Sequence, residues 1–296
     1  MRIFLAGATG VVGRLLVPLL IDAGHEVTGT ARNPEGLGRL RALGATAVQA
    51  DALDADGLRD AVTAAAPDVM IHQLTALGQG RPADNARIRR EGTRNLVDAA
   101  RRAGVGRIIA QSVAWAYEPG DAPADETTPL DLAAPPPRAA LIGGIRALEE
   151  TAAELPGHVI LRYGTFYGPG TWYAPGGAVA RQLRPDRAGG DAPAALPGPL
   201  VADDAVSSFL HVEDAARAAV AALGWPSGAV NVVDDEPAPA RDWLPVLAAV
   251  LGAPVPPAAS GRAGWQRGAS NARARALGWA PPHPSWRTGF AAMKTC

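Results

Sequence analysis

The chain has 296 residues but only one lysine, Lys294. Arginine supplies nearly all of the positive charge, and 28 basic residues against 29 acidic residues leave a formal net charge of -1. This balance argues against the strongly basic surface of nucleic-acid-binding proteins. No polybasic run marks an anionic membrane as a partner either. We therefore expect neither a nucleic acid nor a membrane as a partner.

Cysteine and long hydrophobic runs are also scarce. Cys296 is the single cysteine, so no disulfide can form within the chain, which favours a reducing compartment. No stretch approaches the ~20 apolar residues of a membrane span, and the apolar run at 3–6 is too short for a signal peptide. We expect a cytoplasmic protein, compatible with an oligomer, and we predict no metal site.

Strand and helix patterns alternate through the first part of the chain. This alternation predicts an α/β fold with a doubly wound parallel sheet that has helices on both faces. The expected strands are 2–6, 26–31, 45–50, 68–74, 106–112, 158–163 and 229–233; the expected helices are 11–23, 54–66, 85–104, 138–155, 211–223 and 241–251.

A glycine-rich loop, Gly7-Ala8-Thr9-Gly10-Val11-Val12-Gly13, follows the first expected strand directly. Glycines at this spacing let the backbone turn sharply beside a pyrophosphate, and the helix that begins there directs free N–H groups at the negative charge. The sequence therefore predicts a Rossmann core over 1–163. A small C-terminal substrate lobe would occupy most of 164–296, with 205–233 returning to the core. A tight turn without a ligand is the alternative. The residues predicted to contact the cofactor here are Gly7, Thr9, Gly10, Val11, Val12 and Gly13.

The end of the second expected strand indicates which dinucleotide fits. A carboxylate there would take the ribose hydroxyls of NAD, but the chain has Thr30-Ala31-Arg32-Asn33. Arg32, together with Arg14, would suit the 2′-phosphate of NADP(H). The alternative is that Arg32 is a solvated surface charge.

Two further strand ends complete the predicted cofactor site. Asp51 and Ala52 follow the third strand and are expected beside the adenine, although Asp51 could instead be a loop or helix-cap acid. Leu74, Thr75 and Ala76 follow the fourth strand and would pass under the ribose by topology.

Several motifs in order resemble the extended short-chain dehydrogenase/reductase family along nearly the whole chain. They are Glu91-Gly92-Thr93-Arg94-Asn95-Leu96, the run 161–170, Phe209-Leu210-His211-Val212-Glu213-Asp214, Asn231-Val232-Val233 and Ala276-Leu277-Gly278-Trp279. The resemblance implies a Rossmann core, a small substrate lobe and redox or epimerase chemistry. It places Gln111, Tyr163 and Phe166 on the cofactor side of the site.

The departures from the family pattern concern the proton donor. The family's Tyr-x-x-x-Lys pair falls on Leu141 and Ile145, and an active-site asparagine falls on Arg89. The family's serine is retained as Ser112, the one catalytic residue that we predict. This pattern of loss is similar to that of angucyclinone ketoreductases.

Aromatic side chains are expected to line a flat, apolar substrate pocket. The predicted substrate residues are Trp115, Tyr117, Tyr167, Trp172 and Tyr173. Arg181, Arg184 and Arg187 could hold a sugar diphosphate, but a solvated helix face is the simpler interpretation. His72 and His211 are expected to be satisfied core histidines, and Trp265, Trp279 and Trp286 to form the core of the small lobe.

Together these features predict an NADPH-dependent ketoreductase that acts on a polycyclic aromatic polyketide ketone in antibiotic biosynthesis. A phenol on the substrate could assist by stabilising the forming alkoxide. Two alternatives stay open: a non-catalytic NADP(H)-binding sensor or scaffold, and a nucleotide-sugar epimerase or dehydratase. The missing tyrosine and lysine argue against the second alternative, because its chemistry depends on repeated proton transfer.

Overall fold

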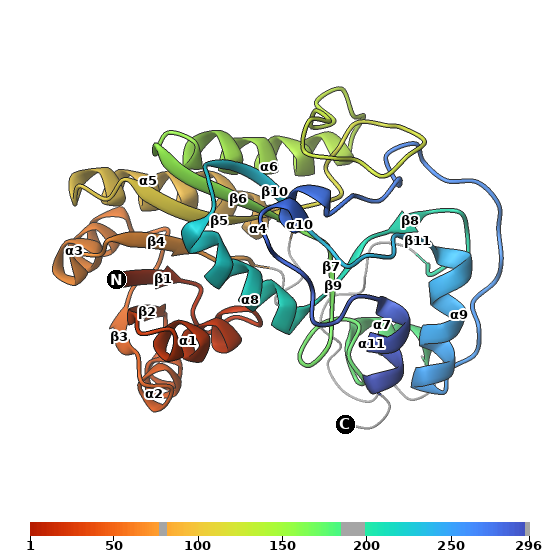
Figure 1. The fold of residues 1–296 in the computed structure, drawn as a ribbon, viewed down its shortest axis with the longest axis horizontal. Coiled ribbons are helices and arrows are strands. Elements are labelled where there is room, and N and C mark those ends of the chain that lie inside the picture. The colour runs from red at the N-terminus through yellow and green to blue at the C-terminus, as the bar shows by residue number, and fades with distance from the viewer. Residues whose placement is uncertain (77–81, 185–198, 294–296) are drawn as a thin grey trace.

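A seven-stranded parallel sheet forms the centre of the computed structural model, which describes residues 1–76, 82–184 and 199–293 (Figure 1). The strand order is β10-β6-β5-β4-β1-β2-β3, which confirms the predicted doubly wound fold. The strands are β1 (Arg2–Ala6), β2 (Glu26–Ala31), β3 (Thr46–Gln49), β4 (Val69–His72), β5 (Arg107–Val113), β6 (Gly157–Tyr163) and β10 (Gly228–Val232).

The chain reverses its direction of winding at β1. This strand pairs with β2 on one side and with β4 on the other, both in parallel register. In open α/β sheets, ligands bind in the crevice at the carboxyl ends of the strands where the order reverses. The glycine loop leaves β1 at this point.

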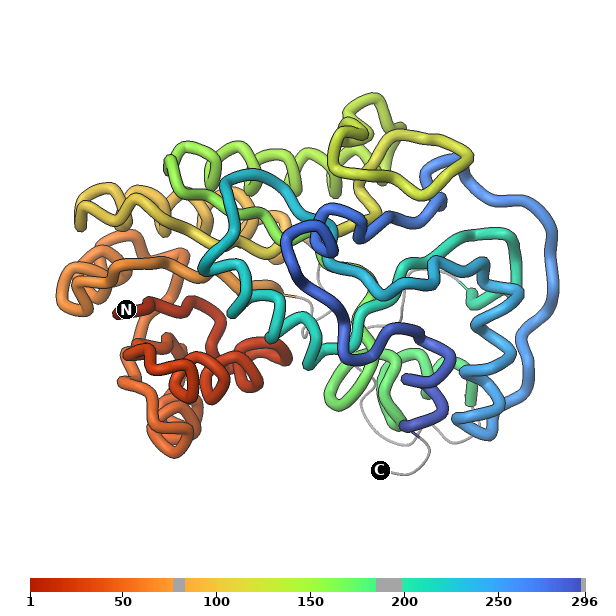
Figure 2. Tube along the Cα trace, viewed as in Figure 1, coloured from red at the N-terminus to blue at the C-terminus, as the bar shows by residue number. Residues whose placement is uncertain are grey.

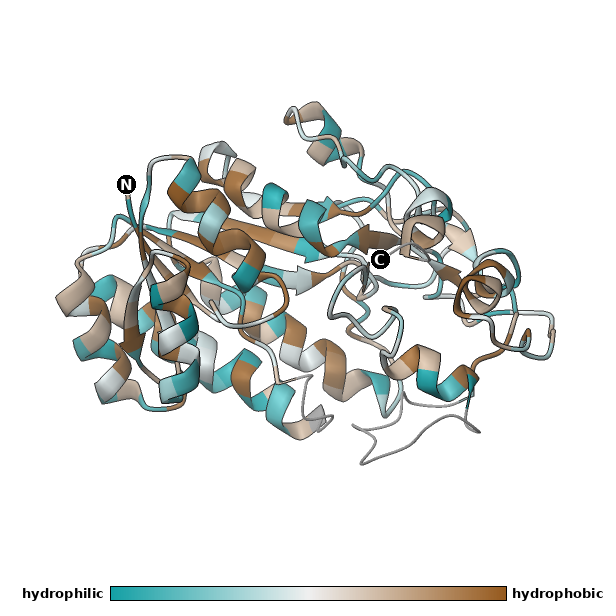
Figure 3. Ribbon diagram, turned by 90° about the horizontal axis from the view of Figure 1, so that it is seen from below, coloured by the Kyte–Doolittle hydropathy of each residue, from teal (hydrophilic) through white to brown (hydrophobic). Residues whose placement is uncertain are grey.

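Helices cover both faces because each carries an apolar stripe that must be buried. One apolar cluster joins the sheet to α1, α2 and α8, and the opposite cluster joins it to α3, α5 and α6. Apolar residues concentrate on the central strands (Figure 3). These helices are α1 (Gly13–Asp22), α2 (Pro34–Ala42), α3 (Ala55–Ala65), α5 (Thr93–Arg102), α6 (Arg138–Ala152) and α8 (Val212–Ala221).

Two parts of the core differ from the sequence-based prediction. Helix α2 was not predicted, although Asn33 caps it by accepting from the Gly36 N–H at 2.8 Å, and Pro34 opens it. The single helix expected over 85–104 is α4 (Pro82–Arg87), then a π-helix (Ile88–Gly92), then α5. π-Helical turns are often found at functional sites.

A smaller lobe packs at one end of the sheet, and the chain crosses between core and lobe more than once (Figure 2). Its apolar cluster draws on α7, α9 and α11, with Phe209 and Trp286 among the buried residues. The remaining elements are β7 (Thr165–Tyr167), α7 (Ala178–Leu183), β8 (Val206–Ser207), β9 (Phe209–His211), the short 3-10 helix Ala222–Gly224, β11 (Ala238–Pro239), α9 (Ala240–Leu251), α10 (Ala272–Ala276) and α11 (Trp286–Ala292).

The three tryptophans expected in the lobe core have separate locations. Trp286 packs in the lobe, as expected, whereas Trp279 packs in the main core with α1 and α8. Trp265 lies against the guanidinium of Arg138, 4.0 Å from the ring centroid. Among the described residues, no helix has the length and apolar character needed to cross a membrane.

His72 ends β4 and is fully buried, as expected of a core histidine. Its Nδ1 accepts from the Leu74 N–H at 3.2 Å, and its Nε2 lies 3.0 Å from the Thr93 hydroxyl. Burial, reinforced by the charge of Arg89, lowers the pKa of His72 from 6.5 to about 4. The folded protein therefore holds this ring neutral.

This lowered pKa predicts acid sensitivity. Between pH 6.5 and about 4 the unfolded chain binds a proton at His72 that the folded chain does not. The contribution of neutral His72 to the free energy of unfolding is fully present above pH 6.5. It declines by up to about 3 kcal/mol as the pH falls toward 4. Urea unfolding across this range should show a smaller pH dependence for His72→Gln than for the wild type. Equal slopes would contradict the assignment.

Candidate functional site

The glycine loop passes so close to neighbouring backbone that side chains do not fit. A Cβ on Gly7 would lie 2.6 Å from the backbone of Gln73, and one on Gly13 would lie 2.2 Å from the carbonyl oxygen of Gly7. Thr9 and Gly10 are exposed, Val11 is half-buried and Val12 enters the core. No side chain caps the start of α1. The Arg14 and Leu15 N–H groups donate to the carbonyls of Gly10 and Val12, so among the described residues the N–H groups of Val11, Val12 and Gly13 are the ones available to an anionic ligand.

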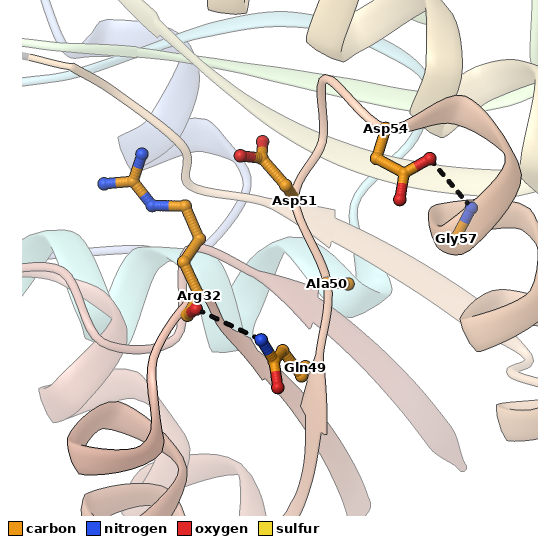
Figure 4. A pocket seen from close by; sticks show the side chains of 6 residues that line it. All are labelled: Arg32, Gln49, Ala50, Asp51, Asp54 and Gly57. Carbon is orange, nitrogen blue, oxygen red and sulfur yellow. Dashed lines mark hydrogen bonds between the residues drawn. The ribbon is translucent and has the colours of Figure 1, made fainter.

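A pocket of about 420 Å³ lies at the ends of β2 and β3. Arg32 and Asp51 extend beside each other into it (Figure 4). Asp51 also accepts from the Leu53 N–H at 3.0 Å, and Asp54 accepts from the Gly57 N–H at 3.1 Å, capping α3. The structure thus brings together at one pocket Arg32, which was expected at the 2′-phosphate, and Asp51, which was expected beside the adenine. Asp54, which the sequence analysis did not include, also lines this pocket.

Arg14 does not extend toward this pocket. Its guanidinium donates to the carbonyl oxygen of Pro169 at 2.8 Å, which ties α1 to the loop after β7. The prediction that Arg14 shares a phosphate with Arg32 is therefore not supported by this geometry.

The loops after β3, β4 and β5 form the middle of the crevice. The Gln111 side chain donates to the carbonyl oxygen of Leu74 at 2.8 Å, joining the ends of β4 and β5. Thr75 is exposed and Ala76 donates its N–H to Asn85 at 3.1 Å. Ala52 is buried, and its carbonyl accepts from Asn95 at 2.8 Å. Gln111 therefore positions the loop that carries Leu74, Thr75 and Ala76.

Tyr163 and Phe166 lie where β6 ends, with ring centroids 5.3 Å apart. The Tyr163 hydroxyl accepts from Gln73 at 3.2 Å and donates to the Ala215 carbonyl at 3.4 Å. Burial raises the pKa of Tyr163 well above its usual value. This hydroxyl is therefore a poor proton donor, and only the half-buried Phe166 ring leaves surface for a ligand.

Apolar side chains occupy the two positions where the family has tyrosine and lysine. Leu141 is half-buried on α6, and Ile145, four residues on, is 1% exposed. Neither Leu141 nor Ile145 can donate a proton. The sole lysine, Lys294, lies outside the described residues.

Ser112 has a different partner from the one predicted. Its hydroxyl donates to the carboxylate of Glu149 on α6, and the side chain is buried. This bond uses the proton that hydrogen bonding to a substrate carbonyl would require. The structure therefore places Ser112 in a support role for Glu149, in contrast to the predicted catalytic role.

Glu149 belongs to a buried network that the sequence analysis missed. Arg162 donates to it through two nitrogens, at 3.0 and 2.6 Å, and also donates to the Tyr117 hydroxyl at 3.0 Å. Tyr117 in turn donates to Asn231. Tyr117 is 1% exposed, so its expected contact with substrate is corrected to a role in this network. The signal was available, because Arg162 and Asn231 lie in the quoted motifs.

The other predicted substrate residues divide into enclosed and accessible side chains. Tyr167 is fully buried between Phe209 and Phe290, so it is lobe core and not a substrate contact. Tyr173 is half-buried against Phe209 and Trp243. Trp115 is half-buried near Arg138.

Trp172 is the most open of the predicted substrate residues. It is 39% exposed and lines a second pocket of about 280 Å³ with Arg181 and glycines 170, 176 and 177. Arg181 and Arg184 donate to the carbonyls of Gly176 and Gly252, and Arg187 lies outside the described residues. Arg181 and Arg184 thus each make one contact to a loop carbonyl.

Two histidines and a glutamate meet where α8 begins. His211, Glu213 and His283 place ligand-type atoms within 4.8 Å of one another. Each already has a protein partner: His211 accepts from the Glu213 N–H, Glu213 pairs with Arg217, and His283 bonds Asp214 at 2.8 Å. The two rings stack at 3.8 Å. These contacts join the core to the segment before α11.

Residues 3–233 match the NAD-dependent epimerase/dehydratase family. The chain belongs to this family. The match covers the glycine loop, the sheet and α6, so the family resemblance inferred from the sequence motifs is confirmed at this level.

One relative matches almost from end to end. A Streptomyces protein named 3-diazoavenalumate denitrifying reductase is 46% identical over 98% of this chain and 99% of the relative. The human epimerase family protein SDR39U1 is 29% identical over 85% of this chain and 81% of its own length. The first similarity supports an oxidoreductase.

Two solved structures of NAD-bound enzymes share the fold. The Bordetella bronchiseptica enzyme WbmG, solved with NAD and UDP, superimposes with a TM-score of 0.76 at 23% identity, covering 100% of this chain and 94% of that one. The Thermus thermophilus UDP-glucose 4-epimerase, solved with NAD, has a TM-score of 0.72 at 24% identity, with 99% of both chains covered. These likenesses establish the architecture.

The tight loop gives a direct prediction for cofactor binding. Gly13→Ala places a methyl group against the Gly7 carbonyl and should destabilise the protein by about 1–3 kcal/mol. It should also abolish the rise in melting temperature on adding NADPH or NADH. Gly38→Ala is the matched control, because nothing lies within 4 Å of that position. Normal cofactor stabilisation in Gly13→Ala would contradict the loop's role.

Proposed function

We propose that this protein is an NADPH-dependent reductase of an antibiotic-type pathway that replaces the diazo group of an aromatic compound by hydrogen. The observation that carries the proposal is the apolar pair Leu141 and Ile145 where the family's proton donor belongs. The Streptomyces relative supports it, because its name describes nitrogen loss from a diazo compound.

The residues at the crevice fit a nicotinamide dinucleotide. The glycine loop offers a backbone cradle with no Cβ atoms at its closest approaches, and the pocket at Arg32 lies at the adenine end by topology. The end of β2 has no acid, and Arg32 suits a 2′-phosphate, so we favour NADP(H) over NAD(H). When bound, the reduced nicotinamide supplies a hydride.

Diazo reduction needs no proton donor from the protein. An aryl diazonium ion is already an electrophile, and hydride addition to its terminal nitrogen gives a neutral aryl diazene. The diazene loses N₂ while its hydrogen passes to the ring carbon. One hydride thus converts the diazonium ion to the arene and N₂, with no external proton consumed. Carbonyl reduction, by contrast, develops an alkoxide that usually needs an acid.

The apolar residues have a positive role in this chemistry. Water competes with hydride for a diazonium ion and would yield a phenol. Ile142 and Ile145 are buried on the face of α6 that carries Leu141, and they pack with Ala116 and Ala134. We infer that this apolar wall excludes water from the reacting centre.

A polycyclic aromatic ketone is the second candidate substrate. Leu141 and Ile145 are also compatible with a ketone whose own phenol stabilises the forming alkoxide. The narrower resemblance to the ketoreductase of simocyclinone biosynthesis stays a prediction, as do the sensor and the sugar-epimerase alternatives.

A substrate panel separates these candidates. We expect the purified protein with NADPH to convert 1,2-benzoquinone diazide to phenol, with one N₂ released per NADPH oxidised. Turnover restricted to phenolic polycyclic ketones, and lost on methylation of the phenol, would select the second candidate. Cofactor binding without any turnover would favour the sensor. Thermal stabilisation by UDP with no reduction would favour the sugar enzyme.

The cofactor preference depends on Arg32. Replacing it by glutamate removes a charge-assisted contact and repels a 2′-phosphate, so the dissociation constant for NADPH should rise by about 10- to 100-fold. Binding of NADH should weaken less or improve. Arg41→Glu, at an exposed position on α2, is the control. Equal effects of Arg32→Glu on both cofactors would contradict the NADP(H) assignment.

A further inference from the structure

Arg89 is a buried cation beside the position of the missing lysine. It lies in the π-helix between α4 and α5, with 8% of its surface exposed. A Cβ on Gly144 would lie 3.6 Å from its Cδ, and Gly144 directly precedes Ile145 on α6. The chain therefore brings positive charge to this part of the site from a different element.

The guanidinium of Arg89 has no hydrogen-bond or ion-pair partner among the residues that the structure describes. The nearby charge that favours its cationic form is Glu149, but Glu149 already pairs with Arg162 through both oxygens. His72, the other titratable neighbour, is held neutral. Arg89 is therefore a largely uncompensated charge.

The guanidinium is nevertheless reachable. None of its nitrogens is among the enclosed side-chain atoms that lack a partner, so they retain some accessible surface. Burial lowers the pKa of Arg89 to about 10, and the group is still charged at neutral pH. Buried charges are normally paired, so an anionic ligand is the missing partner.

We propose that Arg89 is a catalytic residue that binds the substrate oxygen next to the diazo group and stabilises the negative charge that this oxygen acquires. The proposal rests on the proposed function and assigns its substrate class, the ortho-oxygenated aryl diazo compounds. Such a compound is neutral overall, with a positive diazo group and a negative oxygen.

The charge change explains why a permanent cation is needed. Hydride adds to the terminal nitrogen and cancels the diazonium charge, leaving a phenolate. N₂ then leaves, the hydrogen passes to the ring carbon, and the phenolate takes a proton from water. The sum is one diazo compound, one NADPH and one proton giving one phenol, N₂ and NADP⁺. A guanidinium stabilises the phenolate without transferring a proton.

An equilibrium measurement tests the site without turnover. The protein with saturating NADP⁺ is titrated with 4-nitrophenol, whose colour reports its ionisation. We expect the wild type to bind the phenolate and lower the probe's apparent pKa. Arg89→Gln should weaken binding by about 10- to 100-fold and abolish that pKa shift. Arg90→Gln, an exposed neighbour on the same helix, should match the wild type. Equal binding by Arg89→Gln would overturn the proposal.

A kinetic comparison tests the catalytic role. Arg89→Gln should lower kcat/KM for 1,2-benzoquinone diazide by about 100-fold or more. It should change kcat/KM far less for benzenediazonium, which lacks the oxygen. Equal losses on both compounds would show a structural role and overturn the proposal. A loss confined to 4-carboxybenzenediazonium would also overturn it, by making Arg89 an anchor for a remote carboxylate.

Stability separates a binding role from a folding role. Removing an unpaired buried charge should not destabilise the protein, so Arg89→Met should melt at or above the wild-type temperature without substrate. A large fall would overturn the picture of an uncompensated charge. Arg89-dependent binding of 4-nitrophenolate without diazo reduction would refute the proposed function and retain the anion site. Diazo reduction that is unaffected by Arg89→Gln would support the proposed function and overturn the anion site at Arg89.

Discussion

The buried ion pair between Glu149 and Arg162 fixes the geometry on which the candidate site depends. It connects α6 to β6, and through Ser112 and Tyr117 it reaches β5 and the segment that follows it. Both side chains are about nine-tenths buried, so removing one partner would leave an uncompensated charge at a cost of about 3–5 kcal/mol. The pair therefore holds α6 in register against the sheet, and this register sets where Leu141 and Ile145 lie.

The same ion pair has an electrostatic consequence. Because Arg162 neutralises Glu149, the carboxylate is not available to Arg89, which is left as the positive charge of this region. The site thus combines an apolar wall in place of the family's acid with a cation supplied by the π-helix. This combination suits a reaction in which a hydride generates negative charge and no proton has to be transferred by the protein.

Much of this arrangement could be predicted from the sequence, because it depends on local patterns. The strand and helix alternation gave the sheet, and the glycine spacing placed the loop. The positions of Leu141 and Ile145 followed from motif order. Local signals also existed for α2, in Asn33 and Pro34, but its low apolar content concealed them.

The contacts that decide side-chain roles are long-range and could not be predicted in this way. Ser112 and Glu149 are 37 residues apart, and Tyr117 and Asn231 are 114 apart. Tyr117 and Tyr167 were expected at the substrate because aromatic residues suit a flat ligand. Their burial is decided by long-range packing, Tyr117 against Val233 and Ala269, and Tyr167 within the core of the lobe. Arg89 was noted only as a departure from the family pattern, because its lack of a partner is visible only in three dimensions.

The pH dependence of kcat/KM tests the central claim, that hydride is delivered without an acid from the protein. Benzenediazonium is the substrate of choice because it has no titratable oxygen. Arg89 and Tyr117, with pKa values of about 10 and 12, and His72, at about 4, do not titrate near neutrality. Burial raises the pKa of Asp234 to about 8, so the account predicts a profile that is level within about twofold from roughly pH 6 to 7, below that value. A rate that falls about tenfold per pH unit across this range would reveal a general acid and contradict the account.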